Sequence, residues 1–304
     1  MEPITKTFTQ SYFRSLFLPL PNANSRQGSF FPNRPAVLGL WLLAVVIIIV
    51  FLGPMVSNQM PDQVDLSRTN QAPSQEYWFG TDQLGRDLFT RVCYGARLSL
   101  FVALSTAVIV SFIGVVYGGF AGYMGGWTDE VLMRVLEIIA SVPFLIYAIL
   151  LMTVLGPGVN SLLVALAAVY WMPMARVVRG QFINLKEEGF VIAARVLGLS
   201  RWRIILGHIV PNALGVIIVY GTLVIPEAIF AEALLSYIGL GVSSPQSSLG
   251  SLVGDGLGSI RLYPWQLFFP ALFIILLVLS LNLIGEGLRE YCDPRFFRQG
   301  GNGE

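Results

Sequence analysis

Long apolar stretches alternate along this chain with shorter polar ones. The apolar stretches cover residues 36–56, 98–128, 131–155, 159–177, 211–235 and 265–285. At 1.5 Å per residue the shortest of them forms a helix about 28 Å long, close to the roughly 30 Å of a bilayer's hydrocarbon core. Only 12% of the residues are charged, about half the usual share in soluble domains. The pattern therefore predicts an all-α polytopic membrane protein with six transmembrane helices.

The polar segments differ in charge, and this difference predicts their sides. The tail 1–35, the loop 178–210 and the tail 286–304 are rich in arginine, whereas the loops 57–97 and 242–264 carry more acidic, serine and glycine residues. Basic segments next to membrane spans stay in the cytoplasm. We therefore expect a membrane domain over 36–285 with outer loops 57–97 and 242–264 and both termini cytoplasmic. Residues 13–18 suit either a short interfacial helix or part of a disordered tail.

The stretch 187–212 is amphipathic and basic, and it lies between two predicted spans. Phe190–Leu197 suits a short helix, and Gly198 can adopt the positive φ that ends one. Ser200 can cap a second helix, and Pro211 fits the first turn of the next span. The stretch therefore predicts a helix-turn-helix on the membrane surface.

This stretch resembles the cytoplasmic coupling loop of ABC importer permeases, the "EAA" signature. In that family the loop docks into a cleft on the ATPase subunit. The residues that the resemblance assigns to coupling are Ala193, Ala194, Gly198, His208 and Pro211. Ile192 stands where the family has an acidic residue, which removes one polar contact from the expected interface. An ordinary amphipathic interfacial helix is the alternative interpretation.

A second motif ends the first outer loop. It reads Gly-Thr-Asp-Gln-Leu-Gly-Arg-Asp and is similar to the hallmark of the dipeptide/oligopeptide/nickel branch of ABC permeases, specifically the C-type subunit. Its fixed positions are Gly80, Thr81, Asp82, Gly85, Arg86 and Asp87. The three charged side chains can form a local ion-pair cluster, and the two glycines permit tight turns. The motif can also brace the loop before the next span, and both roles are compatible.

Carboxylates inside the apolar stretches are the remaining candidate functional groups, since they are costly there. Glu232 opens a run, through Ser236, Gly239 and Gly241, that again resembles a signature of this branch. Glu232 is expected either to contact a partner permease or the pore, or to be satisfied by backbone N–H groups or an arginine. Glu137 is expected to pair with Arg134, three residues earlier.

Glycines gather at the end of the second span. They are Gly114, Gly118, Gly119, Gly122, Gly125 and Gly126. Small residues let helices approach closely within a membrane, so the first four predict a tight helix–helix contact. The last pair predicts a turn.

Several kinds of chemistry have no motif here. Neither Lys6 nor Lys186 follows a glycine, which excludes a phosphate-binding P-loop in this sequence. His-Glu-x-x-His, Cys-x-x-Cys and Gly-x-Ser-x-Gly are missing too, so no metal site, cofactor site or catalytic residue is predicted. The net charge of +1 gives no reason to expect nucleic acid as a partner.

The resemblance, which covers roughly residues 36–299, implies the type I permease fold and a transport function. It implies a permease subunit, not itself an enzyme, that forms half of the pathway of an ATP-driven peptide importer in a bacterial-type inner membrane. Its partners would be membrane lipid, a homologous permease, an extracytoplasmic solute-binding protein and two ATPase subunits that hold ATP and Mg. Nickel or another chelate is the alternative substrate. A stand-alone secondary transporter using Glu137, Glu227 or Glu232 is the other alternative, although no inverted repeat is visible.

Overall fold

The computed structural model describes residues 34–57, 59–242 and 246–292. Within these ranges the regular elements are helices, with one isolated bridge between Thr81 and Asp87. The predicted all-α class is confirmed. The possible helix at 13–18 and the end of the C-terminal tail lie outside the described residues.

The helices follow one another along the chain with short connections. They are α2 (Arg34–Ser57), α3 (Leu88–Met124), α4 (Gly126–Ala140), α5 (Phe144–Leu155), α6 (Val159–Leu185), α7 (Gly189–Val196), α8 (Arg201–Ile204), α9 (Val210–Tyr237), α10 (Leu249–Ser259) and α11 (Trp265–Cys292). Among the described residues, 5 helices are long and apolar enough to cross a membrane, or up to 6 if the bent pair α4 and α5 forms one span.

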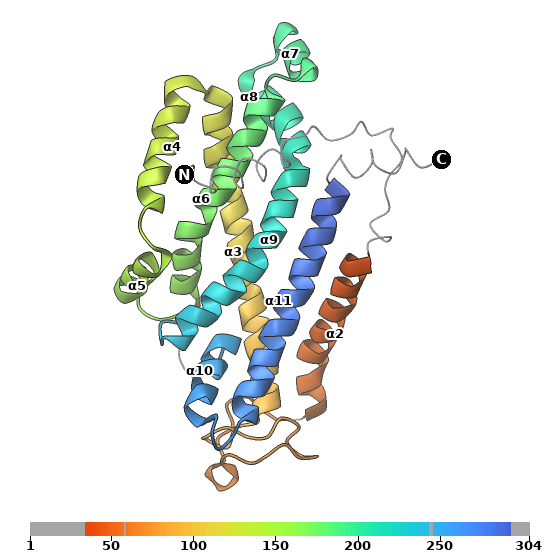
Figure 1. Ribbon diagram of the computed structural model, residues 1–304, viewed down its shortest axis with the longest axis vertical. Coiled ribbons are helices and arrows are strands. Elements are labelled where there is room, and N and C mark those ends of the chain that lie inside the picture. Colours follow the sequence, from red (N-terminus) through yellow and green to blue (C-terminus); the bar gives the residue numbers. More distant parts are fainter. Residues whose placement is uncertain (1–33, 58, 243–245, 293–304) are drawn as a thin grey trace, which may run out of the picture.

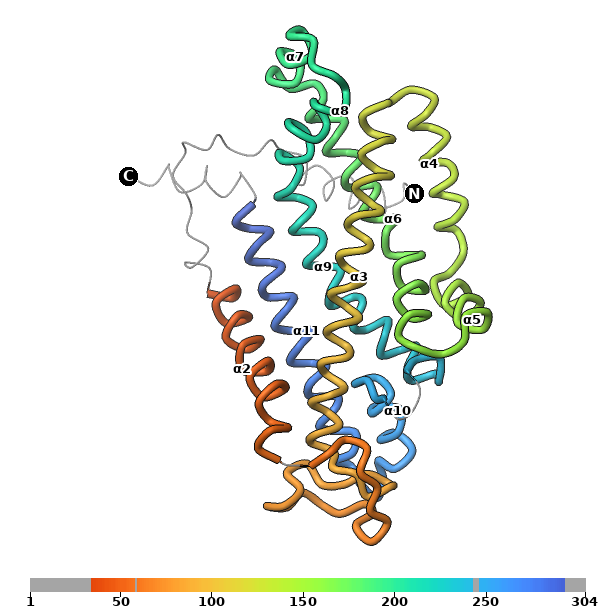
Figure 2. Tube along the Cα trace, turned by 180° about the vertical axis from the view of Figure 1, so that it is seen from behind, coloured from red at the N-terminus to blue at the C-terminus, as the bar shows by residue number. Residues whose placement is uncertain are grey.

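The helices form an elongated bundle with two different ends. Figure 1 shows α7 at one end, and α10 with the loop 59–87 at the other. We call these the hairpin end and the loop end. Seen from behind, α3 runs between the two ends, with α2 and α11 on one side and α4 to α6 on the other (Figure 2). The first residues of α2 and the last residues of α11 both lie toward the hairpin end (Figure 1).

The third predicted span, 131–155, is broken rather than continuous. Helix α4 ends at Ala140, and α5 begins at Phe144 after a bend of 79°. Pro143 has no N–H group for a helical hydrogen bond, and its ring disfavours the helical conformation of Val142. The hydrophobic pattern alone does not reveal this break because both sides of it are equally apolar.

The connecting loops are shorter than the sequence predicted. Helix α3 begins at Leu88, inside the expected outer loop 57–97, and α6 continues to Leu185. The outer loop 242–264 contains α10, whose start carries a capping box made by Ser248 and Ser251. Apolar stretches mark the part of a helix suited to lipid, and the helices themselves extend beyond it.

The second helix of the predicted hairpin runs directly into the fifth span. Residues Arg201–Tyr237 form one helical rod, with a π-helical segment at Ile205–Ile209. Pro211 follows this segment and cannot donate a hydrogen bond to the preceding turn. A π-bulge is a common way to accommodate an irregular hydrogen-bond ladder inside a continuous helix.

The predicted glycine contact is present between α3 and α6. A Cβ atom added at Gly114, Gly118 or Gly122 would lie 2.4, 2.1 or 2.6 Å from an atom of α6, and at Gly118 that atom is the Ala175 carbonyl oxygen. The two backbones therefore touch at a distance that only glycine permits.

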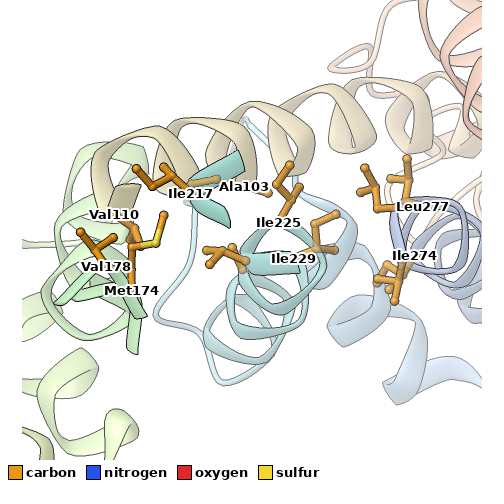
Figure 3. Packing of buried hydrophobic residues seen from close by; sticks show 14 of the residues in the cluster. Ala103, Val110, Met174, Val178, Ile217, Ile225, Ile229, Ile274 and Leu277 are labelled. Atoms are coloured by element: carbon orange, nitrogen blue, oxygen red, sulfur yellow. The ribbon is translucent and has the colours of Figure 1, made fainter. Parts of the chain in front are cut away.

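The main core is built around α9. It contains Ala103 and Val110 from α3, Met174 and Val178 from α6, Ile217, Ile225 and Ile229 from α9, and Ile274 and Leu277 from α11. Figure 3 shows these side chains meeting between the helices, with those of α9 between the groups from α6 and α11. The rod that begins in the hairpin is thus packed against most of the bundle.

A proline in α2 is compensated by an arginine in α3. Pro54 leaves the Val50 carbonyl without its helical partner, because proline has no N–H. Arg97 fills this place: its Nε and Nη2 atoms donate to Val50 O at 3.0 and 2.8 Å. The two helices are therefore joined by a charge-assisted bond as well as by apolar contacts.

Candidate functional site

The hairpin at one end of the molecule consists of α7, a short turn and α8. The turn depends on Gly198, whose φ is +78°. Its N–H donates to Arg195 O at 3.0 Å, and the next N–H, from Leu199, donates to Ala194 O at 3.2 Å. Both bonds satisfy carbonyls at the end of α7, as a glycine C-cap does. Ser200 precedes α8 as predicted, but its side chain makes no capping bond.

The hairpin presents apolar side chains outward. Val191 and Ala194 are buried on the inner face of α7, whereas Ala193 is exposed. Val196 and Leu197 at its tip are 81% and 80% exposed. Further exposed apolar side chains are Phe190, Ile192, Trp202 and Leu206, and the exposed basic ones are Arg195, Arg201 and Arg203. Several large apolar side chains exposed beside basic ones on one short hairpin are typical of a protein-binding site.

The five predicted coupling residues do not all lie on this tip. Ala193, Ala194 and Gly198 belong to α7 and its turn. His208 and Pro211 lie along the rod, Pro211 about 15 Å from the start of α8 along the axis. The His208 carbonyl accepts a bond from Asn212 Nδ2 at 2.6 Å. No group of His, Cys, Asp and Glu residues suited to a metal ion occurs in the described ranges.

The loop end contains a polar cluster centred on Asp82. Its Oδ1 accepts bonds from the backbone N–H groups of Leu84 and Arg86 at 2.8 and 2.9 Å. Its Oδ2 accepts from Arg86 Nε at 2.7 Å and from Arg91 Nη1. The predicted Asp82–Arg86 pair is therefore confirmed, and Arg91 in α3 joins it. Gly85, with φ of +72°, allows the turn that places these groups together.

Asp87 was predicted in this ion-pair cluster, and the structure shows a different role. Its Oδ2 accepts from the N–H and the hydroxyl of Thr90, at 2.9 and 2.5 Å, so it caps the start of α3. Burial raises the pKa of the Asp87 carboxyl, and the bonds from Thr90 oppose that rise. A carboxylate at a helix N-terminus is stabilised by the free N–H groups there.

The polar cluster is tied to the membrane helices by Gln266 of α11. Its Nε2 donates to Asn70 Oδ1 at 2.8 Å and to Thr81 O at 3.0 Å, and its Oε1 accepts from Ser259 Oγ at 2.7 Å. A cavity of about 250 Å³ opens beside the cluster, and Asp255 of α10 contributes to its wall. Burial raises the pKa of Asp255, against the influence of Arg91 and Arg86. The motif thus fixes the loop on α3, α10 and α11, as the predicted brace would.

Replacing Asp82 with alanine is expected to release this loop. The side chains of Asp82 and Arg91 are only 9% and 6% exposed, and removing one partner of a buried ion pair costs about 3–5 kcal/mol. Limited trypsin digestion should therefore cut the variant within the segment 63–91 faster than it cuts the unmodified chain. Asp62→Ala is the matched control, because Asp62 is exposed. Equal digestion of the two variants would contradict the bracing role.

Glu232 is fully buried, at 0% exposure. Its Oε2 accepts from Ser99 Oγ at 2.8 Å and its Oε1 from Ser236 Oγ at 2.7 Å. Serine hydroxyls, rather than the predicted backbone N–H groups or arginine, therefore satisfy it. Ser248 extends the network by donating to Ser236 Oγ at 3.1 Å, and the Leu249 N–H donates to Ser99 Oγ at 3.3 Å. The network joins α3, α9 and the start of α10.

Two predicted neighbours of Glu232 shape the chain after α9. Gly239 has a φ of +82° just past the end of that helix. A Cβ atom at Gly241 would lie 2.0 Å from Ser236 Oγ, so the chain folds back closely onto α9. Glu137 pairs with Arg134 at 3.0 Å, as predicted.

The sequence did not reveal the long-range partners of these groups. Arg179 of α6 holds Asp129 of α4 through a two-pronged ion pair, with Nη2 to Oδ2 at 2.6 Å. Ser99 and Gln266 complete the buried networks described above. A polar residue in an otherwise apolar span is the only local signal for such partners.

Comparison with known proteins decides the family. The model for "binding-protein-dependent transport system inner membrane component" matches residues 114–298, more than half of the chain. This protein belongs to that family. A second model, for the N-terminal TM domain of oligopeptide transport permease C, matches residues 28–73. The two models match separate parts of the chain, with residues 74–113 between them, and they confirm the predicted resemblance to C-type permease subunits of ABC importers.

Curated members of the family are similar over most of their length. The oligopeptide transport system permease protein OppC of Bacillus subtilis is 44% identical over 88% of this chain and 87% of its own. The dipeptide transport system permease protein DppC of the same organism is 44% identical over 88% of this chain and 83% of its own. OppC of Escherichia coli K12 is 44% identical over 88% of this chain and 89% of its own.

A solved structure shares the fold. It shows inward-facing conformations of the MetNI methionine ABC transporter, and its matching chain aligns with a TM-score of 0.51 at 17% identity. The alignment covers 64% of this chain and 93% of that one. The family's type I permease architecture, expected from the sequence, is thereby confirmed.

Proposed function

We propose that this permease subunit forms half of the translocation pathway of an ATP-driven peptide importer. The similarity to OppC and DppC at 44% identity over 88% of the chain is the observation that carries the proposal. The Gly80–Asp87 motif, ordered by the network around Asp82, is consistent with it. Nickel or another chelate is the alternative substrate, and the names of these relatives do not favour it.

The exposed apolar tip of the hairpin is the proposed contact with an ATPase subunit. Two such subunits would hold ATP and Mg, because this sequence has no P-loop. A second, homologous permease would complete the pathway, and a solute-binding protein would deliver peptide at the loop end. Closure of the ATPases would move the hairpin and shift the bundle between two packings.

In this arrangement the hairpin end is cytoplasmic, and so are both termini. Arginine-rich segments support this orientation: Arg195, Arg201 and Arg203 are exposed near the hairpin tip. By the positive-inside rule such residues remain on the cytoplasmic side. The loop end then faces the outside of a bacterial-type inner membrane.

Reconstitution tests the proposed function directly. The four membrane-bound subunits in proteoliposomes, supplied with the solute-binding protein, should accumulate a radiolabelled dipeptide or oligopeptide when ATP is present. Uptake should stop when ATP is replaced by a non-hydrolysable analogue. Accumulation of nickel but not of any peptide would support the alternative substrate, and uptake by this chain alone, without ATPase subunits, would refute the proposal.

A further inference from the structure

One face of the bundle exposes a carboxylate in the middle of a membrane-spanning helix. Helices α6 and α9 pack against each other, and Figure 1 shows them on the near side with α3 behind. Large exposed side chains on α9 include Ile218, Phe230 and Leu234, which are apolar. Glu227 on the same helix is exposed as well. It lies about 15 Å before the end of α9 along the axis.

Two tyrosines lie near this carboxylate. Tyr220 precedes Glu227 by seven residues, which places both on one face of α9. Tyr170 of α6 and Tyr220 are each within electrostatic range of Glu227, and both are partly exposed. The Tyr170 ring is held edge-on by Phe144 of α5 at 5.7 Å. Glu227 therefore lies in a polar patch that two helices form, rather than alone on an apolar surface.

No partner within the described residues neutralises Glu227. It makes no hydrogen bond or salt bridge there, although Arg176 of α6 lies within electrostatic range of Tyr220. This contrasts with Glu232, which is buried and bonded to two hydroxyls. A charged side chain at membrane depth is costly in lipid, and it normally faces water or another polar group. At Glu227 the α6–α9 face is therefore better suited to contact with water and a cation than to contact with lipid.

We propose that the face formed by Tyr170, Tyr220 and Glu227 lines the aqueous pathway, and that Glu227 binds the protonated amino terminus of a passing peptide. The inference rests on the proposed function. A carboxylate pairs with an ammonium group through charge-assisted hydrogen bonds. The tyrosine rings add cation–π attraction and hydroxyl acceptors. The terminal ammonium is shared by peptides of every sequence, so such a contact selects for peptides without selecting among side chains.

Uptake by Glu227 variants tests the substrate contact. We expect Glu227→Gln to lower uptake of peptides with a free amino terminus at least tenfold, and Glu227→Asp to retain most of it. Both variants should keep ATP hydrolysis stimulated by the binding protein, which shows that assembly and coupling are intact. Glu286→Gln is the control, since Glu286 is an exposed carboxylate on a different helix, α11. Unchanged uptake by Glu227→Gln, or an equal loss in the control, would overturn the contact.

Cysteine labelling tests the pathway without any substrate. In a chain with Cys93 and Cys292 replaced by serine, Glu227→Cys should react with a water-soluble, positively charged methanethiosulfonate reagent. Phe112→Cys on α3, where the side chain is 71% exposed and apolar, should not react. An unreactive Glu227→Cys would place this position against lipid or a sealed permease interface and overturn the proposal.

The outcomes of these two tests distinguish a failure of this inference from a failure of the proposed function. If the unmodified complex takes up no peptide under any condition, the proposed function is refuted, and the labelling still decides whether water reaches the face. If peptide uptake is normal but Glu227→Cys stays unreactive, the function stands and the assignment of this face is wrong.

Discussion

Replacing Gly198 with valine is expected to lower ATP-driven uptake by at least tenfold while leaving insertion into the membrane intact. Gly198 has a φ of +78°, and an added Cβ atom would meet nothing within 4 Å. The effect is therefore one of backbone conformation and not of crowding. The left-handed conformation costs an ordinary residue about 1–2 kcal/mol, and a β-branched residue more. Since about 1.4 kcal/mol corresponds to a factor of ten in an equilibrium, the ratio of the native turn to other conformations falls by about tenfold or more.

Gly189→Val is the matched control for this substitution. Gly189 lies at the other end of α7, with no positive φ and no atom within 4 Å of an added Cβ. Uptake into proteoliposomes and co-purification of the ATPase subunits are the measurements. We expect the Gly198 variant to lose both and the control to keep both. Normal uptake in the Gly198 variant would count heavily against docking through this hairpin.

Replacing Gly118 with leucine is expected to abolish the folded state or reduce its yield severely. An added Cβ atom would lie 2.1 Å from the Ala175 carbonyl oxygen and 2.9 Å from its Cα. Neither backbone atom can move aside as a side chain can, so α3 and α6 must separate. Overpacking costs typically 1–3 kcal/mol, and a contact with backbone should reach or exceed about 3 kcal/mol.

Gly258→Leu serves as the control for the glycine contact. Gly258 is also helical and has open space around an added Cβ. Detergent-solubilised yield and the midpoint of thermal unfolding are the measurements, and we expect only the Gly118 variant to lose stability. Equal midpoints for the two variants would show that the helices can separate at little cost.

Much of the fold follows from local features of the sequence. The length of the apolar stretches predicts the spans. Gly198 predicts the turn of the hairpin because few residues other than glycine adopt a positive φ. The break before α5 was missed, although Pro143 provides the signal, because apolar residues continue on both sides. Helix α10 was missed because its composition is rich in glycine and serine. Its stability depends on close contacts such as that of Gly250 with Ala233, where an added Cβ would lie 2.4 Å from Cα.

In the candidate sites too, contacts between residues near in sequence could be predicted, and contacts between distant residues could not. The Asp82–Arg86 pair is local, four residues apart, and could be predicted. The bonds of Arg91 to Asp82 and of Gln266 to Thr81 depend on tertiary structure, which one sequence does not reveal. Glu227 and Glu232 look alike in sequence, since both are acidic residues in one apolar stretch. Their different burial arises only from which face of α9 meets α3 and α10.

The rod Arg201–Tyr237 has a mechanical consequence. Its 37 residues correspond to about 55 Å of helix at 1.5 Å per residue, and they include a π-helical segment and Pro226. Held at the hairpin, the part before Pro226, about 38 Å long, would act as a lever: a tilt of about 5° displaces its end by about 3 Å. Ser236 near the far end of the rod is bonded to Ser248 at the start of α10. A push on the hairpin would therefore be transmitted along one helix toward the loop end and α10, and Pro226 is a place in that helix where it can bend.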